Sequence, residues 1–150
     1  MARLRFSITT EGEVALSAAT AKTVLQAASA ANQRVALRSF GVSFDGVSGS
    51  AEPVVVELVR QSTAGTMSAC TEVVEDDSLP ETIQTVGQKT ATVEPTTGVV
   101  IRAYEVHPQS GIERVFGPDE EVIIKGGGRL GLRCTAPAAV NVTAFLSLEE

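Results

Sequence analysis

The stretch EEVIIKGGGRLGLRCTAPA, residues 120–138, holds three consecutive glycines, Gly126, Gly127 and Gly128, between Lys125 and Arg129. A phosphate-binding Walker loop requires G-x-x-x-x-G-K-[ST] followed by a helix, whereas here the lysine precedes the glycines. GGGRLG fits the dinucleotide pattern G-x-G-x-x-G only formally, because no crossover helix follows it. Apolar residues on both sides instead predict two antiparallel strands, 121–125 and 129–134, joined by a glycine hairpin turn.

Further strands are indicated by alternation of apolar residues with period two, interrupted by turns rich in Gly and Pro. In RVALRSFGVSF the alternation places Ala36, Arg38 and Phe40 on one face and Val35 and Leu37 on the other. Short strands at near-regular spacing are typical of sandwiches and barrels. We therefore expect residues 1–150 to form one all-β domain, an antiparallel β-sandwich resembling a jelly roll. The strand runs are 34–44, 53–61, 98–106 and 139–148.

The segment LSAATAKTVLQAASAAN, residues 16–32, fits two structures. Its alanines favour a helix and supply a helical stripe, while KTVLQAA alternates as a strand does. In a chain otherwise rich in strands we favour a strand near 21–28, with the helix as the alternative.

Composition limits the classes of partner. The 150 residues carry 18 acidic and 12 basic side chains, a net charge of −6, which argues against a sequence-independent DNA binder. No apolar run is long enough for a membrane span, and no apolar core follows Arg3 and Arg5 as in a signal peptide. We therefore expect synthesis in a cytoplasm, with Cys70 and Cys134 as buried thiols; a disulfide between them is the alternative.

Catalytic and metal-binding patterns are weak. The single histidine, His107, precedes a proline in VHPQ, which is typical of a turn. The acidic residues Glu75, Asp76, Asp77 and Glu81 lack the spacing of a calcium-binding EF-hand loop, so a solvated loop is the simpler interpretation. No Ser-His-Asp triad or paired carboxylates can be assembled. We expect no enzyme, no metal and no cofactor.

Five runs give the chain a family resemblance. From roughly residue 20 to the end, the sequence resembles a family of small proteins found in genomes of tailed bacteriophages. The small size of that family's members and their neighbouring genes imply a capsid decoration (cement) protein, a structural component of the virion. The runs are TAKTVLQ (20–26), GVSFDG (41–46), EPVVVELVRQSTAGT (52–66), VHPQ (106–109) and GGGRLGLRCTAPAAVNVTAFLSLEE (126–150).

The resemblance implies a homotrimer bound to the major capsid protein on the exterior of the head, at three-fold and quasi-three-fold positions. It implies no contact with nucleic acid or membrane. Residues 1–12 are a candidate extended N-terminal arm, with Arg3, Leu4, Arg5 and Phe6 contacting the shell by strand addition; the alternative is that they begin the sandwich. A ligand-binding β-sandwich of the phage tail or receptor-binding apparatus is the alternative function.

Overall fold

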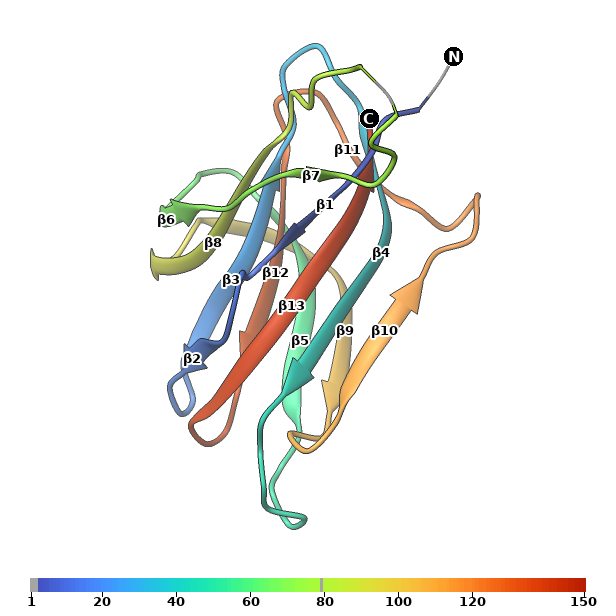
Figure 1. Cartoon of the computed structure of the whole chain (residues 1–150). Helices are drawn as coiled ribbons and strands as arrows, with labels where there is room; N and C mark the ends of the chain where they lie inside the picture. Colours follow the sequence, from blue (N-terminus) through green and yellow to red (C-terminus); the bar gives the residue numbers. More distant parts are fainter. Residues whose placement is uncertain (1–2, 79) are drawn as a thin grey trace.

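A computed structural model describes residues 3–78 and 80–150 (Figure 1). This part of the chain is all-β and forms two antiparallel sheets packed face to face, which confirms the predicted β-sandwich. The strands are β1 (Arg5–Thr9), β2 (Val14–Leu16), β3 (Ala21–Ala28), β4 (Val35–Phe44), β5 (Val54–Gln61), β6 (Thr66–Ala69), β7 (Val73–Val74), β8 (Val86–Val93), β9 (Thr97–Val106), β10 (Gly111–Val115), β11 (Val122–Ile124), β12 (Arg129–Thr135) and β13 (Val140–Glu149).

The strand order is that of a jelly roll. Eight strands pair in nested fashion, β1 with β13, β3 with β12, β4 with β10 and β5 with β9, like one long hairpin folded over itself. The first sheet has the order β10-β4-β13-β1-β7, with β11 beside β4 and β2 beside β13. The second sheet has the order β6-β8-β3-β12-β5-β9. The additional strands β6, β7 and β8 all lie between β5 and β9 in the sequence.

The core between the sheets is mainly aliphatic, as the scarcity of aromatic residues predicts. Its aromatic part is centred on the fully buried Phe40, whose ring lies 5.5 Å from that of Tyr104 and 6.2 Å from that of Phe116. The Arg102 guanidinium covers Phe116 at 5.1 Å from the ring centre. These contacts tie β9 and the segment after β10 to the middle of the sandwich.

A β-bulge at Arg38 corrects the predicted faces of β4. Ser147 of β13 lies opposite Ser39, but Leu148 lies opposite Leu37, so Arg38 is the extra residue. The bulge shifts the alternation by one, and Leu37 and Phe40 therefore both face the core. The expectation that Arg38 and Phe40 share a face was wrong, because a bulge leaves no mark in the apolar pattern.

Residues 21–28 form the strand β3, which confirms the favoured interpretation of the ambiguous segment. Both faces of β3 are covered. In Figure 1 the connection from β8 to β9 passes from one side of the second sheet to the other. On the way, Glu94 accepts hydrogen bonds from the backbone N–H and the hydroxyl of Thr23, both at 2.8 Å. This crossing explains why polar residues of β3 are buried.

Candidate functional site

The N-terminal segment forms part of the first sheet. Leu4 is 5% exposed and Phe6 is fully buried, and β1 pairs with both β13 and β7. The interpretation of these two residues as an extended arm is therefore wrong, and the alternative, a first strand, is confirmed. The cause is the register: pairing Phe6 with Leu148 places its ring in the core. Residues 1–2 of the candidate arm lie outside the described residues.

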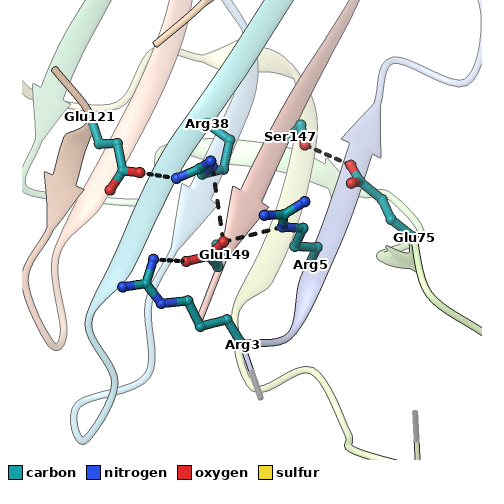
Figure 2. A network of polar contacts seen from close by, with 7 residues as sticks. All are labelled: Arg3, Arg5, Arg38, Glu75, Glu121, Ser147 and Glu149. Atoms are coloured by element: carbon teal, nitrogen blue, oxygen red, sulfur yellow. Dashed lines mark hydrogen bonds and ion pairs between the residues drawn. The ribbon is translucent and has the colours of Figure 1, made fainter. Parts of the chain in front are cut away.

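Arg3 and Arg5 belong instead to a cluster of charges around Glu149 (Figure 2). The carboxylate of Glu149 is 4% exposed and accepts hydrogen bonds from Arg3 Nη1 at 2.8 Å and Arg5 Nε at 3.2 Å. Arg38 Nε lies 3.9 Å from the same carboxylate, and its Nη1 pairs with Glu121. The positive charge that the sequence placed on an arm is thus balanced by two carboxylates within the fold.

The glycine run forms a turn, but not a hairpin. The strand before it, β11, pairs with β4 in one sheet, and the strand after it, β12, pairs with β3 and β5 in the other. The predicted pairing of 121–125 with 129–134 is therefore wrong. The apolar pattern identified both strands correctly but not their partners, which come from distant parts of the sequence.

Backbone conformation and close packing explain why glycine occupies this turn. Gly127 has a φ of 71°, which glycine adopts without strain, and a Cβ on Gly126 would overlap the Ala31 carbonyl oxygen. The N–H of Gly127 donates to Ala30 O at 3.1 Å, and the N–H of Gly128 donates to Lys125 O at 2.8 Å. Since these amides already donate hydrogen bonds within the protein, they do not form a phosphate-binding loop. This agrees with the sequence, which lacks the Walker pattern.

A groove beside this turn gathers positive charge. It encloses about 600 Å³ between the start of β9, the strand β11 and the ends of β5 and β12. Three cations, Arg60, Lys125 and Arg129, line it together with Val99 and Ile123, and no carboxylate lines it. Arg60 Nη1 donates across the groove to the Ile123 carbonyl oxygen at 2.9 Å. We call this hollow the basic groove.

A buried polar network fixes the wall of the basic groove. Arg129 Nη1 donates to Gln26 Oε1 at 3.2 Å, and Gln26 Nε2 donates to Gln61 Oε1 at 2.7 Å. Gln61 Nε2 donates in turn to the Thr23 hydroxyl at 2.9 Å. Gly131 leaves the space for this chain, because a Cβ there would overlap the Gln61 amide. Arg129 is therefore held in place by the fold before any ligand arrives.

Three of the seven exposed valines of the described residues lie along one open side of the sandwich. In Figure 1 the outer strands β9 and β10 run along this side, and β9 pairs with β5 alone. Val99 and Val100 of β9 are 62% and 42% exposed, and Val115 at the end of β10 is 66% exposed. We call this surface the open side. A long strand edge with apolar side chains is suited to association with another protein.

A second hollow of about 420 Å³ lies at the opposite end of the sandwich. Its wall is mostly apolar and includes Val47, Val54 and Pro137. His107 lies close by, in the turn between β9 and β10 as predicted, where its Nδ1 accepts the Gln109 N–H at 3.2 Å. A pocket of this size and polarity is adequate for a small apolar group.

Both cysteines are free and buried, as expected from the sequence. Burial raises the pKa of the Cys70 thiol to about 11 and that of Cys134 to about 12, with nearby carboxylates adding to both shifts. Neither thiol therefore has the low pKa of a nucleophilic cysteine.

In residues 3–78 and 80–150, no three His, Cys, Asp or Glu side chains are placed to hold a metal ion. The same residues include no helix that is long and apolar enough to cross a membrane.

Comparisons with protein families, with curated proteins and with solved structures found no match for this chain. The resemblance to a phage protein family therefore stays a prediction. The basic groove could not be predicted from the sequence, although Lys125 and Arg129 flank the three glycines. Arg60 is distant in the sequence, and only the pairing of β5 with β12 brings it beside Arg129.

Proposed function

We propose that this protein is a capsid decoration protein that binds the outer surface of a phage head. It acts as a homotrimer on the major capsid protein, at three-fold and quasi-three-fold positions, and is made in the host cytoplasm. The observation that supports this function best is the open side, where Val100 and Val115 are exposed beside an unpaired strand edge. The family resemblance supplies the phage context, and the jelly roll is a fold that viral capsid proteins use, although other proteins share it.

The stabilising mechanism is burial of surface across joints of the shell. Internal DNA pressure pulls neighbouring shell subunits apart, and a protein bound to two of them opposes that movement. Apolar burial contributes roughly 25 cal/mol per Å² before the costs of association. Three linked copies add avidity, because the first attachment raises the effective concentration of the others.

The proposal is tested with heads assembled without the protein. The double variant Val100→Lys/Val115→Lys places two charges on the open side and none in the basic groove, and we expect it to lose binding to heads. Val86→Lys is the matched control, since Val86 is 52% exposed but lies on β8, at the other side of the second sheet. The readouts are copies bound per head and the temperature at which filled heads release DNA. A cryo-EM map of the particle with no copies on the shell exterior would remove the proposal.

The apolar hollow at the other end supports the second candidate, a ligand-binding module of the phage tail or receptor-binding apparatus. Its volume of about 420 Å³ falls within the usual range for ligand pockets. Ala138→Trp would fill the hollow from its exposed rim. If this candidate is right, the variant loses adsorption to host cells. If the protein is a decoration protein, adsorption and head binding both persist.

A further inference from the structure

The basic groove contrasts with the rest of this acidic protein. Of the nine other cations, six form ion pairs with carboxylates of the described residues, and three, Lys22, Arg34 and Arg102, do not. Arg60, Lys125 and Arg129 form none with that part of the chain, and the groove that they line contains no carboxylate. Arg60 and Lys125 are exposed, so their charges are available to a ligand. The groove therefore attracts an anionic partner.

The chain itself carries a segment of matching chemistry. Between β7 and β8 lie the exposed acids Glu75, Asp76, Asp77 and Glu81. Asp76 organises the segment by accepting hydrogen bonds from the N–H and hydroxyl of Ser78, at 3.1 and 2.6 Å. Val73, which precedes the segment, is 54% exposed. An exposed valine beside several carboxylates complements a groove that has apolar walls and three cations.

The groove and the acidic segment lie on opposite sides of one molecule. β11 is at one edge of the first sheet and β7 at the other, while β9 and β8 lie toward opposite edges of the second sheet. We propose that the basic groove binds the acidic residues between β7 and β8, namely Glu75, Asp76, Asp77 and Glu81, of a second copy of this chain. The contact is head-to-tail, and such contacts generate closed rings when the rotation between copies closes.

This inference deepens the homotrimer part of the proposed function by identifying the surfaces that join the copies. Val99 borders both surfaces, whereas Val100 and Val115 of the open side lie outside the groove and stay free for the shell. The two proposals fail separately, because self-association is measured on the purified protein and shell binding on heads.

The test is analytical ultracentrifugation of the purified full chain. We expect wild type to associate at low salt and to dissociate progressively between about 0.05 and 0.5 M NaCl, because salt screens exposed charges. The variant Arg60→Glu/Lys125→Glu should weaken association at least about tenfold, since it places like charges opposite each other. The variant Asp77→Lys/Glu81→Lys should have the same effect. Combining all four substitutions should restore association.

Lys22→Glu is the control, because it reverses one charge on β3 near the other end of the sandwich; it should leave association unchanged. Circular dichroism checks that each variant is folded. A wild-type protein that stays monomeric at every concentration overturns the inference, and so does association that survives both double reversals. Failure of the fourfold variant to associate also overturns it. So would inorganic phosphate binding at Arg60 and Lys125 without any self-association, since the groove would then be a small-anion site.

Discussion

Replacing Phe6 by alanine separates a structural role of the N-terminus from an arm role. The Phe6 side chain is fully buried and lies opposite Leu148 of β13 and Val74 of β7. Truncating a buried phenylalanine to alanine costs about 3–5 kcal/mol, from lost burial and the cavity that remains. Domains of this kind have about 5–15 kcal/mol of stability in total. We therefore expect Phe6→Ala to remain folded only marginally.

The assay is urea unfolding followed by circular dichroism, with the midpoint compared at an unchanged slope. Ser7→Ala is the matched control, because Ser7 is on the opposite face of the same strand, beside Ser147. It should change the free energy of unfolding by less than about 0.5 kcal/mol. The reasoning is refuted if Phe6→Ala loses less than about 1 kcal/mol. Deleting residues 1–8, which removes Leu4, Phe6 and Ile8 from the core, should prevent folding altogether.

Three further predictions concern buried polar groups. Glu149→Gln should cost about 1–3 kcal/mol of stability in urea unfolding, because it removes a charge that is hydrogen-bonded to two arginines. Gly131→Ala should lower the free energy of unfolding by about 1–3 kcal/mol in the same assay, because the new methyl group displaces the Gln61 amide. An unchanged free energy would mean that the hydrogen-bond network around Gln61 adjusts without loss. Cys70 and Cys134 have pKa values raised to about 11 and 12, so their contribution to stability is complete below about pH 9 and is lost as the pH rises through those values. Unfolding free energies measured from pH 8 to 11 should fall less steeply for Cys134→Ala, and native protein should react with a thiol reagent only on unfolding.

The sequence predicted the strands well because burial on one face imposes a local pattern. β5 and β13 were located to within about a residue by alternation alone, as is expected when one side of a strand meets the core. β8 was missed, because VGQKTATV buries few apolar residues and pairs mainly through its backbone. A strand can therefore be predicted from its own residues only where its apolar side chains are buried on one face.

Partners and sites were harder to predict, because they depend on contacts between distant residues. The run around Gly127 gives two strands and a turn, but sequence cannot distinguish a hairpin from a connection between sheets. In both cases glycine is needed for the turn, while the pairing of β11 with β4 is decided about 85 residues earlier in the chain. The basic groove likewise depends on distant residues, since it forms only when β5 pairs with β12.

The two clusters of positive charge differ in one respect that bears on function. Around Glu149, three arginines pair with a carboxylate of the same molecule, so their charge is neutralised within the fold. Around the glycine turn, Arg60, Lys125 and Arg129 line a groove without a carboxylate, although acidic residues outnumber basic ones by 18 to 12. With acids in excess, leaving three neighbouring cations without one keeps them available to a partner. A solvated patch would show no preference for the acidic segment of another copy, and self-association would then be unaffected by reversing Arg60 and Lys125. Salt sensitivity together with rescue by the fourfold charge exchange is therefore the result that distinguishes a built docking groove from an incidental basic surface.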